Sequence, residues 1–139
     1  MAAFVIKAEI ADAQAAEFAF AAIKTMYGGK LIAPGDEAFL IASETCGGQG
    51  LCALGVVMEA VPTPRLEGVA RQTPRVSVVV RRTALAARPL GRAQLKAFRA
   101  WADGRPETEL NFKLYRQATD KIVGVSAATA DWLRGWAGA

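Results

Sequence analysis

Short apolar stretches follow one another along this chain and are separated by turns rich in glycine and proline. This pattern predicts strands over residues 4–10, 38–42, 51–61, 75–85, 111–118 and 122–125. Helices are expected over residues 12–26, 92–101 and 126–136. Because strands and helices do not alternate regularly, a doubly wound parallel sheet is disfavoured. We expect an α+β fold: a small mixed, mostly antiparallel β-barrel of about six strands flanked by about three helices, since closure removes exposed sheet edges.

The helices are predicted from capping residues and from the spacing of apolar residues. Asp12 is a good N-cap, and Ala16, Phe20, Ile23 and Tyr27 then recur at helical spacing, which places Tyr27 on a core stripe. Residues 92–101 carry apolar side chains at every third position, and Ser126 is the expected cap of the last helix. Residues 111–118 alternate between apolar and polar side chains, which favours a strand whose every second residue shares one face.

Size and hydropathy place the chain among water-soluble globular proteins. At 139 residues, with 53% hydrophobic and 22% charged side chains, residues 1–139 are expected to form one domain. The apolar runs are far shorter than the roughly 20 residues that cross a bilayer. The first residues show neither a secretory signal nor a lipid anchor. We therefore expect a cytoplasmic protein that does not contact a membrane.

The chain contains no histidine, which excludes Ser/His/Asp triads, Cys/His pairs and histidine-bearing metal sites. Its two cysteines, Cys46 and Cys52, match neither a redox C-x-x-C motif nor a zinc ribbon, so neither a metal nor a cofactor is expected. We interpret them as free thiols and leave a reversible bond between them open. The glycines of residues 47–50 lack a following Lys-Ser/Thr, so they predict a hairpin loop and not a phosphate-binding loop.

Charge is distributed very unevenly along the chain. Residues 1–64 hold three Lys, no Arg and seven acids, for a net charge of −4, whereas residues 65–139 hold eleven Arg, three Lys and six acids, for +8. The densest basic stretch could form one surface, and it contains Arg65, Arg71, Arg75, Arg81, Arg82, Arg88 and Arg92 with only Glu67 among them. Since guanidinium groups bind phosphate bidentately, we expect RNA or DNA as the partner. A solvated basic surface, with arginine favoured by a genome of high G+C content, is the alternative.

The order of elements resembles the PUA-like superfamily, and more narrowly its EVE, ASCH and YTH branch. The resemblance rests on the Pro34-Gly35-Asp36 turn before an apolar strand and on the returning segment Gly55-Val-Val-Met-Glu59. The closing segment 115–133, with Ile122-Val-Gly-Val-Ser126 and a later Trp132-Leu133, is similar to the ending of EVE-like domains. The resemblance spans most of the chain, although each motif is short.

This resemblance implies a barrel surface that holds a nucleotide, frequently a modified base lifted out of RNA or DNA. Such a base needs an apolar or aromatic wall, groups that recognise its edge, and cations for the flanking phosphates. Candidate residues at one barrel end are Lys24, Tyr27, Ser43, Glu44 and Thr45. The closing segment adds Asn111, Lys113, Tyr115, Arg116, Gln117 and Thr119. Arg81 and Arg82 are further candidates, but as neighbours on a strand they face opposite sides, so only one can point at a ligand.

Other interpretations stay open. Tyr27 and the tryptophans Trp101, Trp132 and Trp136 are ordinary core residues if their helices are amphipathic, and the tryptophans are reserve candidates for stacking. Some ASCH-like proteins are small amidohydrolases that act on acylated nucleosides, and Lys24, Thr25 and Glu44 supply the residue types that the resemblance implies for that reaction. Lys24 and Thr25 are neighbours on the expected helix, where successive residues project about 100° apart, and this is a poor geometry for joint catalysis. A protein-interaction domain that binds an acidic protein is the third alternative.

Overall fold

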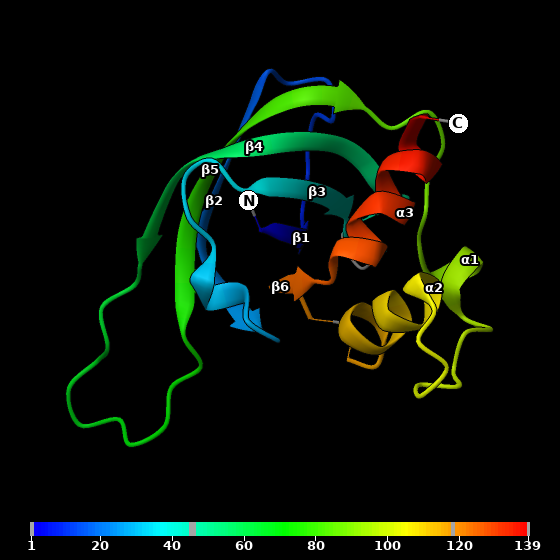
Figure 1. The fold of residues 1–139 in the computed structure, drawn as a ribbon. Coiled ribbons are helices and arrows are strands. Elements are labelled where there is room, and N and C mark those ends of the chain that lie inside the picture. Colours follow the sequence, from blue (N-terminus) through cyan, green and yellow to red (C-terminus); the bar gives the residue numbers. More distant parts are fainter. Residues whose placement is uncertain (1, 45–46, 118, 139) are drawn as a thin grey trace.

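The computed structural model describes residues 2–44, 47–117 and 119–138, and its strands close into a barrel (Figure 1). The strands are β1 (Ala3–Ala8), β2 (Glu17–Met26), β3 (Glu37–Ala42), β4 (Gly50–Pro62), β5 (Arg75–Leu85) and β6 (Lys121–Val125). The helical elements are the 3₁₀ turn η1 (Gly29–Leu31), α1 (Arg92–Leu95), α2 (Pro106–Leu110), the π-helical turn η3 (Asn111–Tyr115) and α3 (Ala127–Gly138).

The strands follow the order β1-β3-β4-β5-β2-β6 around the closed barrel. The pairs β1/β3 and β2/β6 are parallel, and the remaining four pairs are antiparallel. The expected mixed, mostly antiparallel six-stranded barrel with helices beside it is thus confirmed. Parallel pairing of β1 with β3 requires a crossover, and β2 together with η1 supplies it.

Two apolar cores result from strand alternation. Phe4, Ile6 and Leu40 point into the barrel, whereas Val5 and Phe39 point outward and are covered by α1, α2 and α3. Because β1 and β3 are buried on both faces, they carry nearly continuous apolar runs, and the buried strand predicted over residues 38–42 is confirmed. The helical layer therefore lies against one side of the barrel (Figure 1), next to the barrel end that carries the candidate site.

The predicted helix over residues 12–26 is wrong, because residues 17–26 form strand β2. Phe18 and Phe20 face the core, and a β-bulge between Phe20 and Ile23 then shifts the alternation so that Ile23 packs against the same core. Ala22 lies in this bulge at φ 50°, and its N–H donates to the Ser77 hydroxyl over 2.9 Å. The extra residue changes a two-residue repeat into a spacing that resembles that of a helix.

The predicted strand over residues 111–118 is also wrong, because Pro106 starts a helix that continues through η3 to Tyr115. Proline suits the first helical position, and acidic residues follow it in the first turn. Leu110 and Leu114 are fully buried one turn apart, so the apparent alternation belongs to a helix with one core face. The expected sharing of a strand face by residues of this segment does not occur.

The helices predicted over residues 92–101 and 126–136 are present at these positions, but the first is shorter than predicted. The helix expected over residues 92–101 is confined to α1, and Trp101 beyond it is 51% exposed and not part of a core stripe. Ser126 caps α3 as predicted, since its hydroxyl accepts the Thr129 N–H over 3.2 Å. Within the described part of the chain, no helix is long and apolar enough to cross a membrane.

Candidate functional site

Two neighbouring pockets open beside α1. The first has a volume of about 630 Å³ and lies between α1 and the end of β3, and the second, of about 410 Å³, lies between α1 and η3. Both are lined by Arg92 and Lys96, so they form one continuous depression. Volumes of about 300–1,000 Å³ are typical of sites for small molecules and cofactors.

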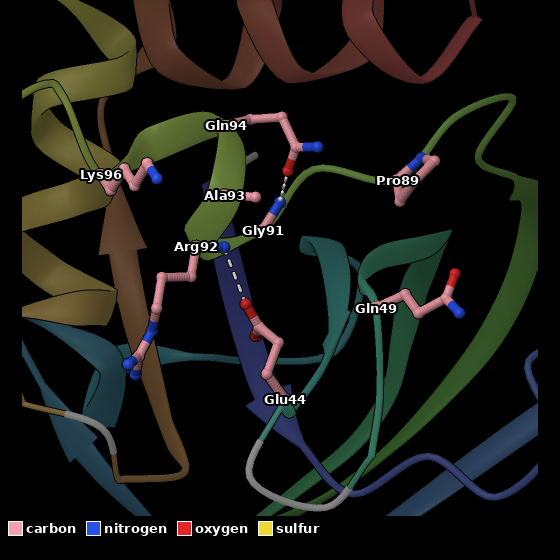
Figure 2. Close-up of a pocket in the computed structure, with 8 residues that line it drawn as sticks. All are labelled: Glu44, Gln49, Pro89, Gly91, Arg92, Ala93, Gln94 and Lys96. Carbon is pink, nitrogen blue, oxygen red and sulfur yellow. Dashed lines mark hydrogen bonds between the residues drawn. The ribbon is translucent and has the colours of Figure 1, made fainter.

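Glu44 forms the floor of the first pocket (Figure 2). Its Oε2 accepts the backbone N–H of Arg92 over 2.7 Å, and its Oε1 accepts the Tyr115 hydroxyl over 3.0 Å. A Cβ atom at Gly91 would lie 2.9 Å from Glu44 Oε2, so glycine permits this close approach. Each carboxylate oxygen can accept a second hydrogen bond, which leaves acceptors for a donor on a ligand.

The second pocket is strongly basic and partly aromatic. Its lining comprises Arg92, Lys96, Arg99, Trp101, Asn111, Tyr115 and Arg116. The Arg116 guanidinium lies 4.3 Å from the centre of the Phe112 ring and 6.0 Å from that of Trp101. Four cations beside a half-exposed indole are suited to an anionic, flat ligand, because guanidinium groups bind phosphate while the indole face stacks.

Asn111 positions Trp101. Its Nδ2 donates to the backbone carbonyl of Leu95 over 2.8 Å, and its Oδ1 accepts the indole Nε1–H of Trp101 over 3.4 Å. The Trp101 ring also meets the edge of Phe112 at 5.3 Å between ring centres. Since the amide uses a donor and an acceptor within the protein, Asn111 holds the aromatic wall in place and contributes less to the edge of a ligand than its sequence position suggested.

Tyr115 separates the pocket from the barrel wall. Lys7 Nζ lies 5.4 Å from the centre of its ring, and the Arg92 guanidinium lies 5.6 Å from the same point. Burial raises the pKa of the Tyr115 hydroxyl, and the hydrogen-bonded Glu44 carboxylate raises it further. Tyr115 is therefore a neutral hydrogen-bond donor to Glu44 at physiological pH.

The remaining candidates of the closing segment have varied surroundings. Lys113 Nζ donates to Glu109 and to the carbonyl of Gly124, which is a structural role. Arg116 donates to the Tyr27 hydroxyl over 3.4 Å, so Tyr27 lies at the rim and not on a helical core stripe. The backbone carbonyl of Gln117 accepts Lys121 Nζ, while Thr119 is exposed.

Lys24, Ser43 and Thr45 were expected to converge with Tyr27 and Glu44 at one barrel end. Ser43 is buried and its N–H donates to the carbonyl of Ala8. Lys24 lies near Lys121, whose pKa it influences. Thr45 lies outside the described residues, as does Cys46, so the bond left open between the cysteines is not described. Cys52 is a free thiol whose pKa is raised by burial.

Arg81 and Arg82 lie away from the pockets, on the part of β5 that pairs with the start of β2. Arg82 donates to the backbone carbonyls of Ala15 and Gln14. The arginines of the basic stretch do not gather on one surface: Arg88 stacks on Trp136 at 3.6 Å, and the 63–74 loop with its own arginines extends away from the barrel (Figure 1). Of the arginines in that stretch, Arg92 is the only one that lines the two pockets among the residues that the structure describes.

Several lining residues were not predicted as site residues, namely Arg92, Lys96, Arg99 and Gln49. Lys7, whose Nζ lies 5.4 Å from the centre of the Tyr115 ring, and Lys121, which pairs with Lys7, line neither pocket and were not predicted either. Arg92, Lys96 and Arg99 could have been found from their spacing, since basic residues three or four apart share one face of a helix. Lys7 and Lys121 had no such signal, because each is a single lysine within an apolar strand.

The geometry does not assemble a site from Lys24, Thr25 and Glu44. Neighbouring residues of a strand point to opposite faces, and Thr25 donates from its hydroxyl to the carbonyl of Pro74 over 2.7 Å. Glu44 is engaged by Arg92 and Tyr115. These contacts do not favour an amidohydrolase built from the three residues.

Comparison with solved structures establishes the fold. The chain resembles the human THYN1 protein in complex with 5-methylcytosine-containing DNA, with a TM-score of 0.63 and 17% identity over 97% of this chain and 96% of that one. It resembles the DUF55 domain of human thymocyte nuclear protein 1, with a TM-score of 0.62 and 17% identity over 95% and 96% of the two chains. Rpa0253 from Rhodopseudomonas palustris matches with a TM-score of 0.60 and 21% identity over 99% and 94%.

The chain thus has the fold of the PUA-like superfamily, in the form that EVE-type domains adopt, and the resemblance seen in the sequence is confirmed for the fold. No protein-family model matches the chain, and no curated protein matches it significantly. Because these identities are low, the similarity establishes architecture and does not by itself establish activity.

Proposed function

We propose that this protein binds nucleic acid and recognises a modified base in the depression beside α1. The observation that carries the proposal is the second pocket, where Arg92, Lys96, Arg99 and Arg116 surround the half-exposed ring of Trp101. A base lifted out of the strand can stack on the indole while the flanking phosphates contact the cations. Glu44 supplies an acceptor for an exocyclic amino group in the adjoining pocket.

The structural neighbour in complex with 5-methylcytosine-containing DNA supports this choice of ligand class, and makes 5-methylcytosine the first modification to test. A methyl group adds apolar surface without changing the hydrogen-bonding edge of the base, so an aromatic wall can favour the methylated form. DNA is therefore the first nucleic acid to test, with RNA beside it.

Fluorescence anisotropy with labelled single- and double-stranded DNA and RNA, containing cytosine or 5-methylcytosine, tests the proposal. If all four cations contact phosphates, raising the salt concentration from 50 to 200 mM lowers the affinity roughly 50- to 150-fold. We expect one modified oligonucleotide to bind more tightly than its unmodified counterpart. Absence of binding to every oligonucleotide at 50 mM salt contradicts the proposal. Equal affinity for oligonucleotides with cytosine and with 5-methylcytosine contradicts recognition of this modified base.

Replacing Arg116 should weaken binding without abolishing it. Arg116→Ala removes one phosphate contact beside Trp101, so we expect roughly a tenfold loss of affinity and a salt dependence reduced by about one charge. Arg81→Ala is the matched control, because Arg81 lies on β5 opposite Glu17 and away from both pockets. Anisotropy at several salt concentrations measures both variants, and equal losses for the two would argue against binding beside α1.

A methyl group at Gly91 should disturb recognition more than stability. In Gly91→Ala the new Cβ would lie 2.9 Å from Glu44 Oε2, and the flexible carboxylate can move aside. We expect a several-fold loss of affinity for the modified oligonucleotide and a change in unfolding free energy of less than about 1 kcal/mol. Gly135→Ala on α3, where a Cβ meets nothing within 4 Å, is the control for binding and for urea denaturation.

A further inference from the structure

The connection between β4 and β5 carries a groove far from α1. We call residues 62–76 the arm. The groove has a volume of about 600 Å³ and lies between the arm and Lys30 of η1. In Figure 1 the arm extends from the barrel on the side away from α1 and α2, and the groove shares no lining residue with the two pockets beside α1. It is therefore a separate site.

The arm is held in shape by hydrogen bonds of its own. The Gln72 side-chain amide accepts the Leu66 N–H over 3.0 Å and donates to the Leu66 carbonyl over 2.8 Å, which closes the loop near its tip. Nearer the barrel, the Thr63 N–H donates to the carbonyl of Arg75 over 2.8 Å. A groove that is formed before a partner arrives loses less conformational entropy on binding.

Aliphatic side chains gather around this groove and are open to solvent. Leu66 lines the groove, and Leu31 and Val61 directly neighbour lining residues. Val69 lies near the tip of the arm. These four side chains are between 44% and 71% exposed, and they are four of the seven large apolar side chains that the described chain exposes. Exposed apolar side chains that gather in one place mark a site of contact with another molecule.

The charge of the groove is positive. Its lining contains Lys30, Arg65 and Arg75 and, among the described residues, no carboxylate. The Arg75 guanidinium donates to the carbonyl of Ala22 over 2.9 Å, and the three ion pairs of the described chain involve none of these cations. Glu67 lies on the arm but does not line the groove. A complementary ligand is therefore negatively charged as well as apolar.

The end of β4 offers an open sheet edge that leads into the groove. Strand β3 pairs with β4 only as far as Val56, and Val57 then bonds with the turn that precedes β3. Within the described chain, residues 58–62 of β4 pair on one side only, with β5. Pro62, at the end of this edge, lines the groove. An extended peptide can add a strand to such an edge through main-chain hydrogen bonds.

We propose that the arm and η1 form a docking site for an extended segment of another protein that combines acidic with aliphatic side chains. Its carboxylates pair with the three cations, its aliphatic side chains cover Leu66, and its backbone extends the sheet at β4. A second copy of this chain fits less well, because Pro62 and the β-bulge before it shorten the edge that two copies would share. Nucleic acid fits less well, because the described lining holds no aromatic ring on which a base could stack.

Selection from a phage-displayed library of random peptides tests this proposal. The intact protein is the target, and the Leu66→Ser variant is the counter-target, which should fold normally because Leu66 is exposed. We expect the wild-type protein to enrich peptides that combine Asp or Glu with Leu, Ile or Val. A labelled synthetic copy of the most enriched peptide then gives affinities by fluorescence anisotropy.

Variants locate the peptide. Leu66→Ser should weaken its binding roughly tenfold, because apolar surface that the peptide covers is lost. Arg65→Ala should weaken it several-fold, with a smaller effect at high salt. Leu85→Ser and Arg81→Ala are the matched controls, since both residues lie on β5 and neither lines the groove, and they should bind as the wild-type protein does.

The proposal is overturned if no peptide is enriched, if the enriched peptides lack acidic residues, or if they bind Leu66→Ser as tightly as the wild-type protein. Two other results assign the groove to a different occupant and also overturn it. Weaker oligonucleotide binding by Arg65→Ala without any enriched peptide indicates nucleic acid, and a dimer in sedimentation velocity that Leu66→Ser dissociates indicates a second copy. Oligonucleotides should not displace the peptide, so a failure of base recognition beside α1 leaves this test unaffected.

Discussion

Trp101→Ala should lower the affinity for the preferred oligonucleotide by roughly 10- to 100-fold. Removing an aromatic platform costs about 1–3 kcal/mol per stacked base, and each 1.4 kcal/mol is a factor of ten in affinity. The loss should concern binding and not folding, because half of the Trp101 side chain is exposed. Anisotropy titrations at 50 mM salt, with urea denaturation of the same preparations, measure the two effects separately.

Two further variants sharpen this prediction. Trp101→Phe keeps an aromatic face, so it should retain most of the affinity while losing the indole hydrogen bond to Asn111. Trp132→Ala is the matched control, since Trp132 packs against Trp136 on α3 and lines neither of the two pockets. If Trp101→Ala binds as tightly as the wild-type protein, the base is not held against this ring.

Glu109→Gln should cost about 3 kcal/mol of unfolding free energy at neutral pH. The carboxylate accepts the hydroxyls of Thr129 and Ser126 over 2.6 and 2.7 Å, the backbone N–H of Ser126, and Lys113 Nζ over 2.9 Å. Burial alone would raise its pKa, but these hydrogen bonds outweigh burial and lower the pKa to about 2 from 4.5. The side chain is only 20% exposed, so solvent screens this network little.

The pH dependence of this effect has a defined sign. Because the pKa of Glu109 is lower in the folded protein than in the unfolded chain, its contribution is complete above about pH 5 and is lost as the pH falls from 4.5 toward 2. The stability difference between wild type and Glu109→Gln should therefore shrink over that range. Urea denaturation at pH 7, 5 and 4 measures it. Glu107→Gln on the same helix should change stability by less than about 0.5 kcal/mol, and a difference that does not vary with pH would contradict the role of the carboxylate.

Part of the candidate site could be predicted from residue types alone. Glu44, Tyr115 and Arg116 were named because they are polar or aromatic residues near strand ends or in the closing segment, and the structure brings them to one barrel end. Arg81 and Arg82 were named for their charge, but strand pairing places them near the start of β2. Local sequence indicates what a side chain can do, whereas long-range pairing decides which side chains meet.

Two errors in the predicted elements have the same physical origin. In β2 a bulge at Ala22 shifted the alternation, and in residues 106–115 a helix start at Pro106 preceded a pattern that resembled a strand. A periodicity is informative only while its register is uninterrupted, and a single inserted residue or a strong helix start changes it. The order of the remaining strands survived, so the barrel class was predicted correctly despite both errors.

The sequence by itself determined the class of fold, the exclusion of histidine chemistry and the concentration of positive charge in the second half of the chain. These follow from local properties: hydropathy, turn residues and composition. Only the tertiary structure decided that Trp101 stands beside four cations and that Lys7 lies opposite Lys121. Residues distant in sequence become neighbours through strand register and barrel closure, which depend on packing of the whole chain and leave no trace in any short segment.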